Sequence, residues 1–310
     1  MIKRPFFIVG AERSGTTLLR IMLDHHPRLA CHFEFAYSVD LVADDGTYPD
    51  LKTYRRFLDQ PYLQSRYNSI TDPSLSYPEL VDSFLLGKQG KKDLVGATVH
   101  RHFDRLLHIW PDAILIHITR DGRDVARSRI NMGWDGNVWT AIDAWIETER
   151  DWDRLKSRLD GSRYHEVRYE DLVAFPENEL SKLCGFIGVE YSPAMLAYAG
   201  TSTYDSPDPN LAHQWKTRAT PRDVQLMEAK ASDMLLRRGY ELSGFDEIAV
   251  TDQQSRKLER ESRRGRRKFR LRRYGIVLMA LDNLSRRLPS RSFRRYAQTR
   301  IEAVRRRALK

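Results

Sequence analysis

The stretch FFIVGAERSGTTLLRIMLDHHP, residues 6–27, decides the fold of this chain. Its first four residues are apolar and too few for a helix, so they predict a buried strand. Gly10 and Gly15 bound the turn that follows, and apolar residues from Leu18 onward recur at helical spacing. A strand, a glycine-bounded turn and a helix together direct backbone N–H groups and the positive end of the helix dipole at one anion. The stretch therefore predicts an α/β fold with a phosphate-binding loop.

The spacing of the two glycines matches the P-loop pattern G-x-x-x-x-G, but Thr16 and Thr17 stand where a P-loop carries Lys and Ser/Thr. Without the lysine, no side chain at that point holds the β/γ-phosphates beside Mg²⁺, which argues against a nucleoside-triphosphate hydrolase. Arg13 supplies a cation earlier in the loop. On the glycines alone, a tight strand-to-helix turn without a ligand is the structural alternative.

Residues 10–27 resemble the 5′-phosphosulfate loop of sulfotransferases that use PAPS, 3′-phosphoadenosine 5′-phosphosulfate. The similarity is closest to the Arg-Ser-Gly-Thr-Thr form of the bacterial, carbohydrate and tyrosyl-protein enzymes. It implies a P-loop-like, doubly wound α/β domain with a central parallel sheet flanked by helices. It also implies that PAPS supplies the sulfuryl group without a metal, and that the donor contacts Arg13, Ser14, Gly15, Thr16 and Thr17.

A second motif, ILIHITRDGRDVARS at residues 114–128, begins with the clearest strand of the chain. Arg120 ends this strand, and Ser128 follows eight residues later on the predicted helix, so that both can meet at one oxyanion. Taken alone, the charged turn would be a solvated, ion-paired loop. In the sulfotransferases that it resembles, this Arg and Ser bind the 3′-phosphate of PAPS, and we expect the same of Arg120 and Ser128.

Glu34 is the candidate general base. It lies in the apolar segment 29–35, which returns toward the edge of the sheet where the phosphate loop sits. In the resembling families a glutamate at this place, just after "HP" and a cysteine, takes the acceptor proton, with Arg13 stabilising the charge on the leaving group. A carboxylate without a chemical role is one alternative, and His32 is a rival base because an unperturbed histidine has a pKa near 6.5.

Two other segments differ from the family pattern or match it loosely. Many relatives carry a Gly-x-Lys-Thr-Pro run whose lysine neutralises the sulfuryl group, but Thr98 stands at that place here. The replacement cation is expected among His100, Arg101 and His102. Relatives also close a basic loop with an aromatic residue over the adenosine, which makes candidates of Trp215, Lys216 and Arg218.

The domain organisation follows from composition. Residues 1–250 are predicted to form the catalytic domain, with a supporting "YEDL" turn at 169–172. Residues 40–92, rich in Asp, Tyr, Pro, Gly and Ser, are predicted to form a lid that shapes acceptor specificity. Four tyrosines are candidates to line it, although core packing is the plainer role for most of them: Tyr37, Tyr48, Tyr54 and Tyr62.

Charge separates the body of the chain from its end. Residues 255–310 hold 21 Lys/Arg against four acids, whereas residues 1–254 hold 31 basic and 38 acidic residues. A nucleic-acid role for the main domain is therefore not expected. We expect residues 251–310 to be a basic helical extension that contacts an anionic membrane surface, with a solvated or nucleic-acid tail as the alternative.

Two cysteines, Cys31 and Cys184, and the lack of a recognisable targeting or membrane-spanning segment favour a cytoplasmic protein, peripheral on the inner face of the membrane. The predicted function is sulfuryl transfer from PAPS to a hydroxyl acceptor, favoured as a glycan, a lipid-linked group or a small alcohol. A P-loop-type kinase and a non-catalytic protein that acts through its basic tail are the alternatives. Nothing in the sequence predicts the acceptor's identity or an oligomeric state.

Overall fold

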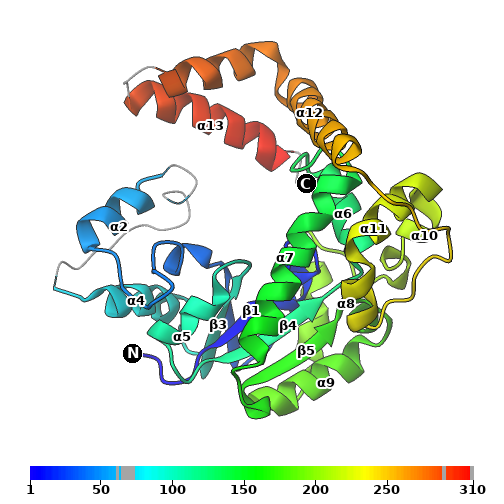
Figure 1. Ribbon diagram of the computed structural model, residues 1–310. Helices are drawn as coiled ribbons and strands as arrows, with labels where there is room; N and C mark the ends of the chain where they lie inside the picture. The colour runs from blue at the N-terminus through cyan, green and yellow to red at the C-terminus, as the bar shows by residue number, and fades with distance from the viewer. Residues whose placement is uncertain (61–62, 64–73, 288–290, 308–310) are drawn as a thin grey trace.

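The computed structural model describes residues 1–60, 63, 74–287 and 291–307, so the candidate Tyr62 lies outside the described residues. Within these residues, five parallel strands form one sheet in the order β2-β3-β1-β4-β5 (Figure 1). The strands are β1 (Phe6–Val9), β2 (Leu29–Glu34), β3 (Leu94–Val99), β4 (Ile114–Thr119) and β5 (Tyr164–Arg168). Because β1 lies between β3 and β4, the chain crosses over it, and ligands of doubly wound sheets bind outside the carboxyl ends at such a reversal. The predicted fold class is confirmed.

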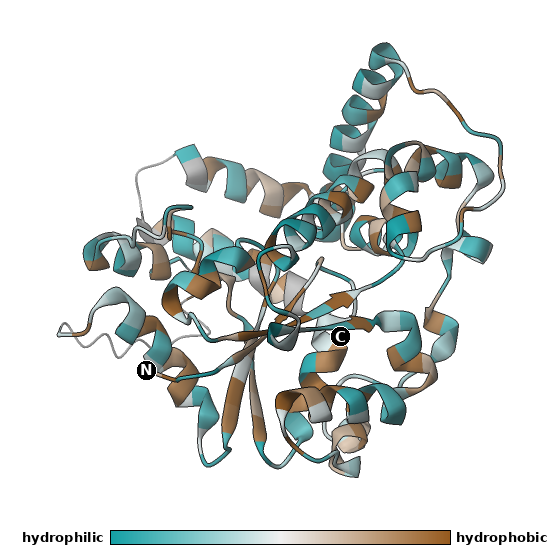
Figure 2. Ribbon diagram, turned by 60° about the horizontal axis from the view of Figure 1, so that its bottom comes forward, coloured by the Kyte–Doolittle hydropathy of each residue, from teal (hydrophilic) through white to brown (hydrophobic). Residues whose placement is uncertain are grey.

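Alternate residues of β1 enter two separate hydrophobic clusters. Phe7 and Val9 pack on one face, and Phe6 and Ile8 pack on the other. The helices that cover these faces are α1 (Thr16–His25), α4 (Tyr77–Gln89), α5 (Leu106–Ile109), α8 (Tyr169–Ala174) and α9 (Pro176–Ile187). A parallel strand that is buried on both faces is apolar at every position. This burial explains the four consecutive apolar residues, and Figure 2 shows hydrophobic residues concentrated on the strands.

A third cluster lies between the helices that follow β4 and the last helices of the body. It joins α6 (Gly122–Asn131), α7 (Val138–Lys156), α10 (Trp215–Arg218) and α11 (Pro221–Arg237). Asp121 caps α6 by accepting a hydrogen bond from the backbone N–H of Arg123, at 3.0 Å. The shorter 3-10 turns are Ala36–Ser38, Phe103–Arg105, Gly161–Arg163, Pro193–Gly200 and Pro209–Leu211.

Two segments differ from expectation. The "YEDL" residues begin α8, where the sequence predicted a turn, because Glu170 and Asp171 place acidic side chains in its first turn. The segment 40–92, expected as a lid, contains α2 (Leu51–Leu58) and α4, but α4 packs against β2 and β3 and buries its apolar residues in the core. This part of the segment is scaffold. Tyr37 and Tyr54 are likewise buried, whereas Tyr48 is exposed.

The basic C-terminal residues form two long helices, α12 (Asp252–Arg287) and α13 (Arg291–Arg307). We call them the arm, and Figure 1 shows it standing out from the layers of the sheet. The first half of α12 packs on the turn between α6 and α7, where a Cβ on Gly136 would lie 2.0 Å from the backbone oxygen of Ser262. A Cβ on Gly265 would in turn lie 2.8 Å from the backbone oxygen of Gly136. Across the described ranges, no helix has the length and apolar character to cross a membrane.

Candidate active site at the carboxyl edge of the sheet

The loop between β1 and α1 is held in a conformation that few side chains tolerate. Arg13 and Gly15 have φ angles of +76° and +93°. A Cβ added to Gly15 would lie 2.3 Å from the ring of Tyr169, so a side chain at that position requires a shift of the neighbouring helix. Left-handed residues of this kind expose successive backbone N–H groups on one side of a loop, which forms an anion-binding concavity. The strand, turn and helix therefore follow in the predicted order, and the backbone of the turn suits an anion.

The structure brings Arg13, Arg120 and Ser128 together from three elements. Arg13 Nε–H donates to Ser128 Oγ at 2.9 Å, which joins the phosphate loop to α6. Arg120 follows the carboxyl end of β4, and its Nη1 donates to the carbonyl oxygen of Arg13 at 3.4 Å. Its guanidinium lies 4.3 Å from the ring centroid of Tyr169, which fixes its plane. Two guanidinium groups and one hydroxyl thus converge beside the N-terminus of α1.

Two buried polar atoms of this region have no partner in the part of the chain that the structure describes: Ser14 Oγ and Arg120 Nε. Buried polar atoms are normally hydrogen-bonded, so each exception calls for an explanation. Both atoms are donors, and a phosphate or sulfate group accepts from donors of this kind. The residues present therefore fit an anionic ligand. Thr16 is also buried, and Thr17 is partly buried at the start of α1.

Glu34 and His100 form a pair at the carboxyl ends of β2 and β3. His100 Nδ1 lies 2.9 Å from the carbonyl oxygen of Gly10, and its Nε2 lies 3.2 Å from Glu34 Oε1. A carbonyl oxygen only accepts, so Nδ1 carries a proton, and Nε2 faces a carboxylate. Burial lowers the pKa of His100, but the hydrogen bond and charge of Glu34 and the carbonyl of Gly10 outweigh it and raise the pKa above its ordinary value. The geometry favours an imidazolium beside a carboxylate.

Of the three predicted replacements for the missing lysine, His100 is the one that the structure places against Glu34. Arg101 instead forms a two-point ion pair with Asp40, with both N–O distances at 2.7 Å. His102 is exposed. The rival base His32 is 8% exposed, and its ring packs against Phe35, with the ring centroids 5.3 Å apart. His32 therefore belongs to an aromatic cluster.

The loop that precedes α11 is anchored over the N-terminus of α6 by two aspartates. Asp124 accepts from the backbone N–H of Trp215 at 2.7 Å, and Asp121 accepts from the indole N–H at 2.8 Å. Burial raises the pKa of Asp124, against the opposing charge of Arg120. Arg120 Nη2 also donates to the carbonyl oxygen of Leu211 at 2.6 Å. From the sequence, Asp121 was expected only as a possible cap of the helix, and Asp124 was given no role; the structure adds their contacts with Trp215.

Trp215 lies in the core rather than on an open surface. It is 6% exposed, and the guanidinium of Arg123 covers its ring at 3.5 Å. The structure therefore gives it a packing role and leaves no open face on which an adenine could stack. Lys216 and Arg218 are exposed on the same short helix. Their exposure leaves both cations accessible to a ligand, whereas the ring of Trp215 is not.

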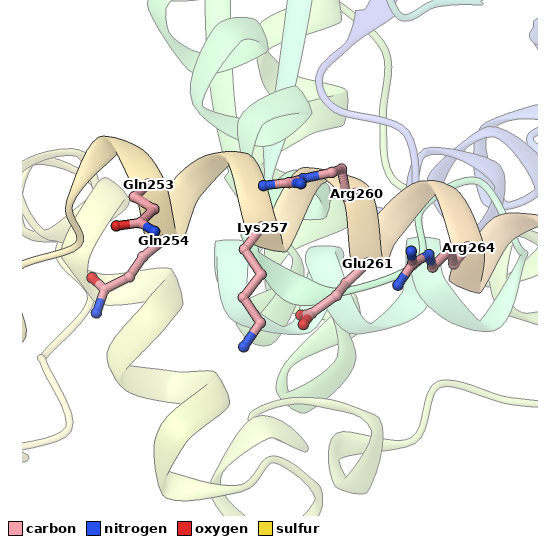
Figure 3. A pocket seen from close by; sticks show the side chains of 6 residues that line it. All are labelled: Gln253, Gln254, Lys257, Arg260, Glu261 and Arg264. Carbon is pink, nitrogen blue, oxygen red and sulfur yellow. The ribbon is translucent and has the colours of Figure 1, made fainter.

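In the ranges that the structure describes, no group of three or more His, Cys, Asp or Glu side chains is arranged to hold a metal ion. A groove of about 410 Å³ runs along the first turns of α12 (Figure 3). Its lining residues are Gln253, Gln254, Lys257, Arg260, Glu261 and Arg264. They come from one helix and include no residue of the phosphate loop.

Known proteins resemble this chain in sequence and in fold. The sequence profile described as "Sulfotransferase family" matches residues 5–193. Protein-tyrosine sulfotransferase 2 of Gallus gallus is 27% identical over 206 residues, which cover 61% of this chain and 52% of the relative. Omega-hydroxy-beta-dihydromenaquinone-9 sulfotransferase Stf3 of Mycobacterium bovis is 30% identical over 259 residues, covering 63% of this chain and 66% of the relative. The chain thus spans between about half and two thirds of these relatives.

Two solved structures share the fold. The sulfotransferase domain from the curacin biosynthetic pathway superposes with a TM-score of 0.58 at 22% identity, covering 78% of this chain and 99% of that domain. The sulfotransferase domain of the Synechococcus PCC 7002 olefin synthase gives a TM-score of 0.56 at 24% identity, covering 74% of this chain and 94% of that domain. At this level of identity the superpositions support the architecture.

Proposed function

Since the chain belongs to the sulfotransferase family, we propose that it transfers the sulfuryl group of PAPS to a hydroxyl group of an acceptor. The observation that carries the proposal is the convergence of Arg13, Arg120 and Ser128 beside a loop with left-handed backbone. When bound, PAPS supplies the sulfuryl group, and the transfer breaks the bond between sulfur and the 5′-phosphate oxygen.

The phosphate loop is proposed to bind the 5′ end of the donor. The buried hydroxyl of Ser14 and the N–H groups at the start of α1 are donors, and Arg13 adds a positive charge. Such preorganised donors stabilise the negative charge that grows on the leaving oxygen, because the loop needs no reorganisation during the reaction. The donor-binding residues proposed here are Arg13, Ser14, Gly15, Thr16 and Thr17.

Arg120 and Ser128 are proposed to bind the 3′-phosphate. Arg120 Nε is buried without a partner among the described residues, although Nη1 and Nη2 are engaged with backbone carbonyls. Lys216 and Arg218 add exposed positive charge from the loop above α6. A fixed 3′-phosphate sets the position of the whole donor, which raises the rate by orientation rather than by chemistry.

Glu34 is proposed to take the proton of the acceptor hydroxyl. Its side chain is 45% exposed, so it can reach an acceptor, and His100 holds one of its oxygens at 3.2 Å. The His100 cation stands near the place of the family's lysine and supplies a positive charge to the same region. A positive neighbour favours the carboxylate form, which a base requires.

The class of acceptor and the position of the protein at a membrane are linked in this proposal. We assign catalysis to residues 1–250, the border of the acceptor site to parts of 40–92, and membrane contact to the extension 251–310. One relative is named for a hydroxylated menaquinone and another for protein tyrosine. The basic extension favours a hydroxyl-bearing lipid or lipid-linked glycan over tyrosine, at the inner, cytoplasmic face of an anionic membrane.

Calorimetric titration without metal tests the reaction class. We expect 3′,5′-ADP to bind more tightly than ADP or ATP, and Arg120→Ala to weaken 3′,5′-ADP by about tenfold or more, since a charge-assisted contact is lost. Arg154→Ala, which removes an exposed arginine of α7, is the control and should change little. A preference for ATP with Mg²⁺ would instead support a kinase.

A further inference from the structure

The second half of α12 exposes three of its aliphatic side chains and buries two of its polar ones, whereas Leu278, Met279 and Leu281 are partly buried. Ile276 and Val277 are 77% and 75% exposed, and Leu284 is 50% exposed. Asp282 and Ser285 are 4% and 0% exposed. A surface helix of a globular protein has the opposite arrangement, with the apolar stripe toward the core.

Helical geometry separates these two sets cleanly. At 100° per residue, the exposed apolar residues occupy one arc of the helix, and the buried polar residues lie opposite. We call this arc the apolar face of the arm; it comprises Ile276, Val277, Ala280 and Leu284. An exposed group of aliphatic side chains marks a place of interaction, whereas scattered single residues do not.

Polar contacts fix the orientation of this segment. Gly275, with φ +72° and ψ +165°, interrupts the helix and produces a kink between its two halves. Across this bend Arg270 Nη2 donates to Asp282 Oδ2 at 3.1 Å, although the two residues are twelve apart in sequence. Ser285 Oγ donates to the carbonyl oxygen of Asp282 at 2.8 Å. The helix is held with its aliphatic residues outward.

Cations surround the apolar face. Arg272 and Arg287 are exposed on the same helix, and Arg294 is exposed on α13. Arg273 lies over the ring of Phe269 at 4.7 Å. The 21 Lys/Arg of residues 255–310 give the arm a strongly positive field. Aliphatic residues flanked by arginines match a surface that is apolar inside and anionic at its boundary.

We propose that the apolar face of the arm inserts at the boundary between the headgroups and acyl chains of an anionic lipid bilayer, with the arginines on the headgroups. This specifies the membrane contact proposed above and is independent of the sulfuryl transfer. A second copy of the arm would bring the same positive charge and repel the first. Phosphates of a nucleic acid would need the arginines but not Ile276 and Val277.

The first half of α12 links the apolar face of the arm to the body of the protein. Phe269 packs on Gly133, directly after α6, where a Cβ would lie 2.1 Å from the phenyl ring. Helix α6 also carries Ser128. A membrane contact at the apolar face therefore sets the orientation of the catalytic edge relative to the lipid surface.

Co-sedimentation of the full chain with vesicles tests the proposal. We expect binding to vesicles with about one third phosphatidylglycerol, little binding to pure phosphatidylcholine, and release at high salt. The double variant Ile276→Ser, Val277→Ser should bind the anionic vesicles about tenfold more weakly, because the inserted aliphatic surface is lost. Ile276→Trp should bind them more tightly, since indoles favour the interface.

The matched control is Leu86→Ser with Leu236→Ser, two exposed leucines of α4 and α11 at 49% and 56% exposure. It should bind within about twofold of the wild type. Affinity for 3′,5′-ADP should be the same in all variants, which separates a failure of docking from a failure of the proposed reaction. Absent vesicle binding, unchanged binding of the serine variant, or a dimer that the serine variant dissociates in sedimentation would each overturn the proposal.

Discussion

Glu34, at the carboxyl end of β2, has a 45% exposed side chain, and His100 contacts its carboxylate at 3.2 Å. If it is the base, Glu34→Gln should lower turnover by about a hundredfold or more, because proton transfer to a positioned group contributes about that much. Binding of 3′,5′-ADP should stay within about twofold, since glutamine has the same shape and lies outside the phosphate loop. The measurement is formation of 3′,5′-ADP from PAPS with the best acceptor in a panel of tyrosine peptides, hydroxylated quinones and sugars.

The outcome that contradicts this assignment is turnover within a few-fold of the wild type. Glu177→Gln is the control, because Glu177 is exposed on α9 and should have no effect on turnover.

His100 gives the site a pH dependence of defined sign. Its pKa is raised in the folded state above the ordinary 6.5. The charged pair with Glu34 therefore stabilises the fold fully below pH 6.5, and this contribution is lost as the pH rises through the folded-state pKa. The free energy of unfolding of wild type and of His100→Gln should differ most at pH 6 and converge at higher pH.

Urea unfolding at about pH 6 and about pH 9 measures this difference. A difference that stays constant across that range would show that the pair does not titrate.

At the scale of elements, the arm is attached by close backbone packing. Gly136→Ala would place a Cβ 2.0 Å from the backbone oxygen of Ser262, so α12 has to move away. We expect the arm to loosen at a cost of about 1–3 kcal/mol, typical of overpacking. Hydrogen exchange of amides 255–270 should be faster in this variant, because the first half of α12 no longer packs closely against the turn at Gly136.

Gly87→Ala is the matched control, because nothing lies within 4 Å of a Cβ at that position of α4. It should leave exchange of the arm unchanged and favour the helix slightly. Unchanged protection in Gly136→Ala would mean that the arm is not held at this turn.

Some of these elements could be predicted from the sequence and others could not. The loop after β1 and the Arg120–Ser128 turn were predictable, because a glycine-bounded turn and a strand-end cation each follow an apolar run. The docking of α12 was not, since Gly136 and Gly265 carry no periodic signal and their role exists only where two backbones meet. Trp215 was expected to stack on the adenine, but it is buried. Its position in a polar loop gave no sign that Asp121 would accept a hydrogen bond from its indole.

For the whole molecule, apolar runs predicted individual buried strands, and the resemblance to sulfotransferases implied the parallel sheet flanked by helices, but neither predicted the strand order. The order depends on which crossover passes over β1, and that choice is made by packing between distant segments. The exposure of the apolar face of the arm could not be predicted from the sequence either, because the bend at Gly275 determines which side of the helix faces outward. The sequence alone showed a basic segment with an apolar patch.

One buried carboxylate, Glu149, links three elements of the body. Glu149 of α7 is 0% exposed, and it joins β4 to the end of α11. His117 Nε2 lies 3.4 Å from it, and Arg238 Nε donates to it at 2.5 Å. Burial raises the pKa of Glu149, but the neighbouring His117 and the charge and hydrogen bond of Arg238 outweigh burial, and the pKa lies below its ordinary 4.5.

A depressed pKa means that the ionised Glu149 stabilises the fold above pH 4.5 and that this contribution is lost as the pH falls through the folded-state value. Glu149→Gln should lower the free energy of unfolding at pH 7 by roughly 3 kcal/mol, because Arg238 loses a buried partner. It should also flatten the fall in stability between about pH 5 and pH 3, since the group that takes up the proton is gone. Urea unfolding across that range measures both effects, with Glu177→Gln as the exposed control. If the glutamine variant matched the wild type at pH 7, the three elements would be joined by packing alone, and the charge of Glu149 would have no part in holding β4, α7 and α11 together.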